Sequence, residues 1–193
     1  MQRYLWWVLV LGMVGVGGVG ADEVEAESTK GFVQIPKTGQ SVSRISGDDG
    51  SLQVGVTWPH PRFSSMVLEG GDVVVDGLTG LMWVKSPHAL KGNVETMPWK
   101  NAVEYCQKLV FAGQTDWRLP NLRELHSLVD YGQHNPALPR WHPFVDIFSD
   151  GYWTGTSLQD NAEHAWVVGF SGGSVNFDRK VYRYQVWPVR GGM

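Results

Sequence analysis

Residues 115–125 read Thr-Asp-Trp-Arg-Leu-Pro-Asn-Leu-Arg-Glu-Leu, and this stretch organises the chain on either side of it. Asn121 is a favourable helix N-cap, and Glu124 follows at the spacing of a capping box. An apolar stripe at helical spacing comes next: Leu122, Leu125, Leu128 and Val129. The pattern predicts a helix that ends near Asp130 and buries one face. In the turn before it, we expect Asp116 and Arg118 to satisfy turn backbone and each other, with Trp117 packed between helices.

Upstream of this helix the sequence predicts a β-hairpin and an earlier helix. Residues 72–76 and 81–84 are short apolar strands, and the Gly-Leu-Thr-Gly turn of residues 77–80 separates them. Pro98 can open a helix, because its missing N–H costs nothing in the first turn. The buried face of that helix would carry Ala102, Tyr105, Cys106 and Leu109. The cysteine is therefore interpreted as core filling rather than as a reactive thiol.

Downstream, the sequence predicts a long loop and then a run of strands. Residues 135–150 contain three prolines and show no periodicity, which is typical of a loop. The strands that follow are expected at residues 152–154, 165–170, 175–177 and 182–189. Their alternation of apolar and polar residues predicts half-buried antiparallel strands. The expected fold class is α+β, with antiparallel sheets of short strands and two flanking helices.

Composition agrees with a β-rich globular protein and excludes several classes. The chain has 193 residues, of which 42% are hydrophobic, 12% aromatic and 18% charged, and it contains 24 glycines. A net charge of −3 argues against nucleic acid as a partner, because no excess of cations is available to neutralise phosphates. A single cysteine excludes an intramolecular disulfide and a cysteine-based zinc site.

The first residues have the three parts of a secretory signal peptide. A short basic start ending at Arg3 precedes an uncharged apolar run over residues 4–19, and Val19-Gly20-Ala21 provides a small-residue cleavage site. We expect residues 1–21 to be removed and the product to be exported to the periplasm, the cell surface or the medium. A retained membrane anchor is the alternative, although the run is short and interrupted by glycines. No second membrane span follows.

Residues 22–65 are interpreted as a polar, extended lead-in, and residues 66–193 as the compact domain. Within the lead-in, Leu52, Val54 and Val56 alternate as a short strand would. Asp48 and Asp49 lie in a turn. A calcium loop is the other interpretation of this acidic pair, but the regular spacing of oxygen ligands is missing.

Seven sequence blocks, in order, make the chain similar to a known family. The blocks are residues 36–40, 56–63, 75–83, 99–106, 115–130 and 152–154 followed by the ending 187–192. Together they resemble the family named after the C-terminal domain of the Lcl collagen-like adhesin. The resemblance implies an exported domain with a variant of the C-type lectin fold, in which the first and last strands pair and two helices flank the sheet. Some relatives carry a second cysteine, which is missing here, so any family disulfide is lost.

The same resemblance suggests a ligand, because the adhesin's domain is associated with sulfated glycosaminoglycans and host surfaces. Sulfate needs clustered cations, and sugar rings need aromatic faces. The densest basic group is Arg179, Lys180 and Arg183, with aromatic residues interleaved up to Trp187. Arg140, followed by Trp141 and His142 in the long loop, is a second and smaller candidate. For both groups the alternative is a solvated sheet edge with ordinary core aromatics.

Catalytic and metal sites find little support in the sequence. A calcium-dependent lectin site would need two acidic motifs, of which residues 119–121 and 176–178 keep only fragments. Residues 118–124 also resemble a segment of the formylglycine-generating enzymes, but those enzymes need two C-terminal cysteines that residues 182–193 lack. The six histidines show no metal-ligand spacing. We therefore expect no enzyme and no cofactor, but a recognition or adhesion module for an extracellular polymer or protein. A structural subunit of an envelope or surface assembly is the alternative, and the oligomeric state stays open.

Overall fold

The structure is a computed structural model that describes residues 35–90 and 96–191. The expected signal peptide and the first part of the lead-in lie outside the described residues, and the compact unit begins at Ile35. Within the described ranges, no helix combines the length and the apolar character needed to cross a membrane.

The first sheet contains the predicted hairpin. Its strands are β1 (Phe63–Leu68), β2 (Gly71–Asp76), β3 (Met82–Val84) and β9 (Val189–Arg190), all antiparallel and in this spatial order. Asp76 at the end of β2 shapes the turn, because its carboxylate accepts hydrogen bonds from the Leu78 amide and the Thr79 hydroxyl, both at 3.0 Å. The hairpin prediction is confirmed, and β9 brings the end of the chain next to β3.

The second sheet contains β5 (Gly151–Ser157), β6 (His164–Gly169) and β7 (Ser174–Arg179), and a further pair joins β4 (Met97–Pro98) to β8 (Arg183–Tyr184). The antiparallel strands expected at residues 152–154, 165–170 and 175–177 are therefore confirmed. The single strand expected at residues 182–189 does not form: its ends belong to β8 and β9, which lie in different sheets. The burial of β6 and β7 differs from the prediction: the neighbours Val167 and Val168 of β6 are both buried, whereas Phe177 of β7 is 52% exposed. The reason is position, because β6 is the central strand with cover on both faces and β7 is an edge.

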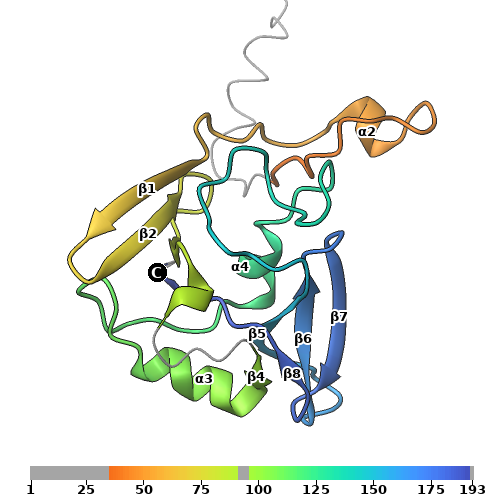
Figure 1. The fold of residues 1–193 in the computed structure, drawn as a ribbon. Coiled ribbons are helices and arrows are strands. Elements are labelled where there is room, and N and C mark those ends of the chain that lie inside the picture. Colours follow the sequence, from red (N-terminus) through yellow and green to blue (C-terminus); the bar gives the residue numbers. More distant parts are fainter. Residues whose placement is uncertain (1–34, 91–95, 192–193) are drawn as a thin grey trace, which may run out of the picture. The chain divides into compact units, whose positions relative to one another are not determined.

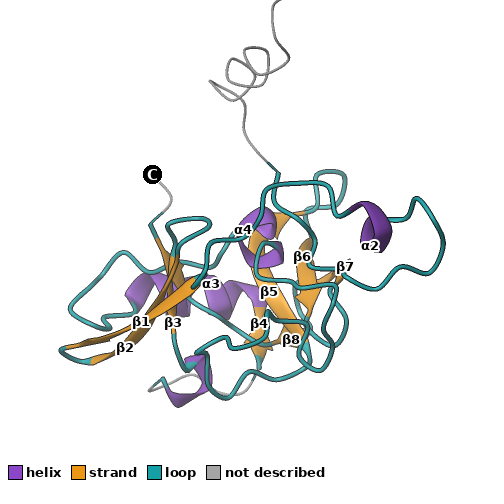
Figure 2. Ribbon diagram, turned by 90° about the horizontal axis from the view of Figure 1, so that it is seen from above, coloured by secondary structure: helices purple, strands orange, loops and turns teal. Residues whose placement is uncertain are grey.

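Two helices flank these sheets, as expected (Figures 1 and 2). Helix α3 (Trp99–Lys108) follows Pro98 and buries Ala102 and Cys106 completely. Burial raises the pKa of the Cys106 thiol well above its ordinary value, which agrees with core filling. A short 3-10 helix, η1 (Pro87–Ala89), follows β3.

Helix α4 (Leu122–His126) has the predicted capping box. The Asn121 carboxamide accepts from the Glu124 amide at 2.9 Å, and the Glu124 carboxylate accepts from the Asn121 amide at 2.7 Å. The helix ends before the expected Asp130, but Leu125 and Leu128 still bury their side chains, because turns continue the chain along the same core.

The largest core cluster joins α4 to both sheets. Its aromatic centre consists of Trp83, Phe144, Tyr152, Phe170 and Trp187. Trp187 lies edge-on to Trp83 at 5.7 Å and to Phe144 at 4.8 Å between ring centroids. Strands, helix and the end of the long loop therefore meet around one tryptophan.

The turn before α4 uses partners that differ from the prediction. Arg118 pairs with Glu124 at 2.7 Å, and Asp116 pairs with Arg190 at 2.7 Å. Asp116 and Arg118 thus do not bind each other; each reaches a partner that folding brings beside it. Trp117 is buried, but against Val73 and Val84 of the first sheet rather than between the two helices.

The lead-in also differs from an extended segment. Asp48 caps a short helix, α2 (Asp49–Leu52), so the strand expected at residues 52–56 does not form. Its last residues enter the domain, because the buried guanidinium of Arg62 makes two 3.0 Å hydrogen bonds to the buried carboxylate of Asp76 and one of 2.7 Å to the Ser127 carbonyl. Strand β1 accordingly starts at Phe63, ahead of the boundary expected at residue 66.

Candidate functional site

The five residues predicted to meet a ligand do not form one site. Arg179, Lys180 and Arg183 lie near the ends of β7 and β8, Arg140 lies in the long loop, and Trp187 lies in the core. The structure therefore divides the predicted site among three separate places.

Trp187 is not available to a ligand, and its assignment as a binding residue is wrong. Its side chain is 0% exposed, and its indole N–H donates to the Val84 carbonyl at 2.9 Å. The residues around it, from Gln185 to Val189, are all buried, because this segment passes between the two sheets. Trp187 is thus an ordinary core aromatic, the alternative that the sequence left open, whereas Tyr182 of the same group is 49% exposed.

Lys180 is held by the protein itself. Its ammonium donates to the Ser157 hydroxyl at 2.8 Å and to the Ala162 carbonyl at 2.7 Å, and it lies 4.2 Å from the centroid of the Trp99 ring. These three contacts fasten the turn after β7 to the end of β5, to the loop before β6 and to the start of α3. The lysine has little capacity left for an anion, whereas the neighbouring Arg179 is exposed.

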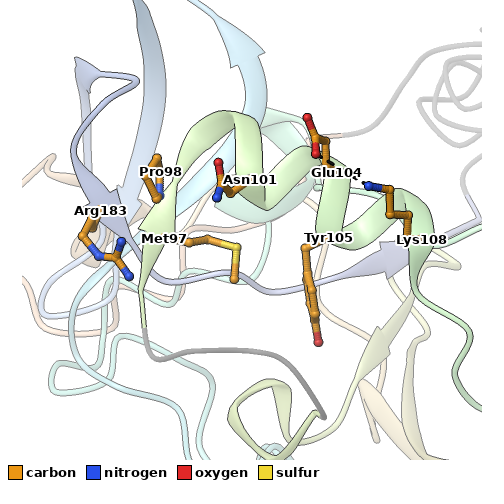
Figure 3. A pocket seen from close by; sticks show the side chains of 7 residues that line it. All are labelled: Met97, Pro98, Asn101, Glu104, Tyr105, Lys108 and Arg183. Carbon is orange, nitrogen blue, oxygen red and sulfur yellow. Dashed lines mark ion pairs between the residues drawn. The ribbon is translucent and has the colours of Figure 1, made fainter.

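Arg183 lines a groove of about 320 Å³ on α3, drawn in Figure 3. Its guanidinium hydrogen-bonds to Thr96. On the helix side, Lys108 lies 3.6 Å from the Glu104 carboxylate, the ion pair drawn in Figure 3. Because an acid lines this groove and neutralises one of its two cations, the groove is a weak candidate for an anionic ligand.

Arg140 lies in a different groove, which we call the aromatic groove. Its volume is about 350 Å³, and the end of the lead-in and the long loop form it together. The described residues that line it are Thr57, Trp58, Pro59, His60, Pro61, Arg62, Phe63, Pro139, Arg140 and Trp141. This set combines three large aromatic rings with two arginines and contains no Asp or Glu.

The most unusual residue of the aromatic groove is Trp141. Its side chain is 94% exposed, the largest exposure among the large hydrophobic residues of the described chain. Its backbone φ is 66°, in the left-handed region that a residue with a Cβ rarely adopts. An exposed indole and a strained backbone each cost free energy, and such costs are concentrated at binding sites.

The two arginines of the groove are placed differently. The Arg62 guanidinium lies over the rings of Trp58 and Phe63, at 4.8 and 4.7 Å from their centroids. Arg140 is exposed at the rim, and its Nε donates to Gln133 at 3.4 Å. Burial raises the pKa of the nearby Asp130 carboxyl, and the charges of both arginines oppose that shift. Both cations therefore act on the same part of the molecule.

Sequence reasoning missed the contribution of the lead-in to this groove. In the sequence, Trp58 and His60 indicate only a polyproline-type segment, and Trp141 is only a neighbour of Arg140. The available signal was the density of rings and prolines in residues 57–63. The sequence does not show which loop residues 57–63 pack against, because that loop lies far along the chain.

Neither groove holds an arrangement suited to a metal ion. Among the described residues, no group of three or more His, Cys, Asp or Glu side chains gathers in one place. The acidic pair Asp48 and Asp49, for which a calcium loop was the alternative interpretation, is used locally: Asp48 caps α2, and the Asp49 carboxylate accepts from the Thr38 hydroxyl.

Most of the described chain matches one known protein family. Residues 72–190 match a family model described as the Lcl C-terminal domain. The match includes Arg140 and Trp141 but begins after Trp58 and His60. Among curated proteins, none matches the chain significantly.

Proposed function

The chain belongs to the family of Lcl C-terminal domains, and from that premise we propose that it is an exported, non-catalytic recognition module that binds an extracellular or envelope polymer. The aromatic groove is its binding site, and Trp141 is the central residue of that site. A lectin-like fold is part of the proposal, supported by the pairing of the last strand, β9, with a strand of the first hairpin.

The single observation that carries the proposal is the exposed indole of Trp141. An aromatic face without a packing partner can stack on the apolar face of a sugar ring at little conformational cost. Trp58 and the neighbouring prolines extend this surface into a groove along the end of the lead-in. A tryptophan in such a position is the kind of residue that dominates binding energy at interfaces.

The charge of the groove favours an anionic polymer such as a sulfated glycan. Arg140 at the rim can offer a planar, two-pronged donor to a sulfate or carboxylate group. The described lining residues include no acid to oppose it. Although the whole chain has a net charge of −3, local charge decides where an anion approaches. The Arg179–Arg183 group contributes less, because Lys180 and Arg183 are already engaged.

Export belongs to the proposal as well, and its support is the three-part N-terminus of residues 1–21. Cleavage after Ala21 predicts that the intact mass of the protein isolated from its native envelope or medium starts at Asp22. A mass that still includes Met1 would argue for a retained anchor.

Binding to a glycan array of sulfated and neutral sugars tests the function directly. The expected result is salt-sensitive binding to sulfated chains without need for calcium. Trp141→Ala and Arg140→Ala should each weaken it about tenfold or more, as loss of a central anchor does. Phe177→Ala is the matched control, since Phe177 is also an exposed aromatic residue but lies on β7.

Two results would contradict the proposal. Binding that survives Trp141→Ala but disappears in Arg179→Ala would move the site to the end of β7. Absence of all glycan binding, together with co-purification of an envelope protein, would support a structural subunit instead.

A further inference from the structure

No described segment pairs with the outer side of strand β1, whereas the other long edges of the described sheets are either paired or charged. The free side of β5 is covered by the final segment, where the Trp153 amide donates to the Gln185 carbonyl at 3.0 Å. The free side of β9 is covered by Arg118, whose backbone exchanges two hydrogen bonds with Val189 at 2.9 and 3.0 Å. β7 carries Asp178 and Arg179, charges of the kind that discourage pairing with another strand.

Nothing in the sequence of β1 protects its edge. The strand reads Phe-Ser-Ser-Met-Val-Leu, without a charge or a proline, and all six residues pair with β2 in regular register. Its central residues from Ser64 to Val67 are exposed, and Val67 is 83% exposed. A six-residue uncharged edge of this kind is a template for a further strand.

The direction of each backbone group on β1 follows from one hydrogen bond. The Arg62 carbonyl accepts from the Gly77 amide at 2.7 Å, so the backbone of Arg62 faces β2. Because the backbone groups of successive strand residues face opposite sides, those of Ser64 and Met66 also face β2. The outward donors and acceptors are therefore those of Phe63, Ser65 and Val67.

We propose that β1 pairs antiparallel with β1 of a second copy of this chain, about a two-fold axis through Ser65. Around that axis Ser65 faces its own counterpart, and Phe63 of each copy faces Val67 of the other. All outward N–H and C=O groups of both strands are then satisfied. A two-fold interface of this kind is closed, so it produces a dimer and not a fibre.

The side chains fit a second copy better than an unrelated strand. The Ser65 axis sets an aromatic ring opposite a β-branched residue, a favourable cross-strand pair. Phe63 is already packed against the core and so offers a rigid surface to the exposed Val67. An axis one residue further, through Met66, would leave Phe63 facing the charged Glu69 of the other copy, so the register is specified.

The dimer would also link two binding sites. Phe63 lines the aromatic groove as well as beginning β1, so the two-fold axis would set two such grooves on one continuous sheet. A polymer with repeated sugars could then bind both, which raises avidity without a new contact. The dimer depends on β1 alone and not on which ligand the aromatic groove binds.

Cysteine substitution tests both the dimer and its register. Ser65→Cys should form an intermolecular disulfide on oxidation, because directly opposed residues have Cα atoms about 5.5 Å apart. Met66→Cys is the matched control: offset from its counterpart, it would lie beyond the roughly 7 Å that a disulfide spans. The native Cys106 does not interfere, since it is 0% exposed.

Sedimentation of the otherwise unchanged protein gives an independent measurement. We expect a dimer at micromolar concentrations, and Val67→Lys should raise its dissociation constant about tenfold or more, because it sets an ammonium group opposite Phe63 of the other copy in place of an apolar side chain. Phe177→Lys, on the charged edge β7, should leave the dimer intact. A monomer at all accessible concentrations, a dimer that tolerates Val67→Lys, or equal cross-linking of both cysteine variants would each overturn the proposal.

Discussion

The long loop (135–150) and the final segment (182–190) look alike in sequence but have opposite roles in the structure. Each places a tryptophan near an arginine, Trp141 after Arg140 and Trp187 after Arg183. Trp141 is 94% exposed, whereas Trp187 is 0% exposed. An arginine beside an aromatic residue is therefore no indicator of a binding surface until the backbone around it is known.

The difference arises from how each segment is paired. The final segment exchanges backbone hydrogen bonds with β5, through Gln185, and with the turn before α4, through Val189. The long loop is also anchored by backbone hydrogen bonds, among them that of the Ala137 amide to the Phe170 carbonyl at 2.7 Å, but Arg140 and Trp141 take part in none of these bonds. The final segment passes between the two sheets and buries its indole against both, whereas the long loop leaves its indole in solvent.

The sharpest test of this comparison is to remove each tryptophan. Trp187→Ala should lower the free energy of unfolding by roughly 3–5 kcal/mol, because it leaves a cavity at the meeting point of several rings. Trp141→Ala should change it by no more than about 0.5 kcal/mol. Denaturant unfolding measures both. Similar losses in the two variants would mean that the loop tryptophan is also part of the core.

Removing the cap of α4, the helix that precedes the long loop, should have a smaller effect on stability. Asn121→Ala removes the cap of α4 and should cost about 1 kcal/mol of unfolding free energy. Arg123→Ala in the same helix is the control, since Arg123 is exposed and the capping box does not use it. If the long loop is held mainly through α4, binding at the aromatic groove should weaken in the first variant only.

Backbone strain at Trp141 predicts a gain in stability. At a φ of 66°, glycine avoids the contact between Cβ and backbone that alanine keeps. Trp141→Gly should therefore be more stable than Trp141→Ala by about 0.5–1 kcal/mol. Thermal unfolding of the two variants checks this. Equal stabilities would show that the loop relaxes once the indole is removed.

The smallest expected effect concerns His142, a partly buried histidine of the long loop. Burial lowers the pKa of His142 below its ordinary value, although a hydrogen bond at Phe144 opposes the shift. The neutral imidazole therefore stabilises the fold above the unfolded-state pKa of about 6.5, and this contribution is lost as the pH falls through the lower pKa of the folded state.

His142→Gln should make the unfolding free energy less dependent on pH between about pH 7.5 and 5.5, measured as denaturant midpoints. Some dependence should remain, because burial also lowers the pKa of His126. A slope unchanged by His142→Gln would place the imidazole in solvent and assign the whole effect to other groups.

Much of the fold was predictable because its signals are local. The capping box joins Asn121 to Glu124, three residues apart, and the hairpin turn depends on Asp76 and the residues just after it. The buried face of α3 follows from the spacing of Ala102 and Cys106. The short helix α2 was missed because a four-residue helix carries almost no periodicity.

The candidate site was predicted less well because its parts are distant in sequence. Arg140 was predicted as a binding residue because Trp141 and His142 follow it in the sequence. Trp58 and His60 line the same groove only because the lead-in packs beside the long loop. The burial of Arg62 depends on its pairing with Asp76, which lies 14 residues further along the chain. Pairings such as Asp116 with Arg190 depend on β9 lying next to β3, which neither residue indicates.

By itself, the sequence determined the elements: where helices begin, where the hairpin turns, and where a long loop interrupts the strands. Those features depend on contacts within a few residues, which leave a pattern that can be read directly. Only the tertiary structure decided which tryptophan is buried and which is presented. The Trp187 indole donates a hydrogen bond to the carbonyl of Val84, 103 residues earlier in the chain. The burial of a side chain depends on such distant segments, which no local pattern identifies.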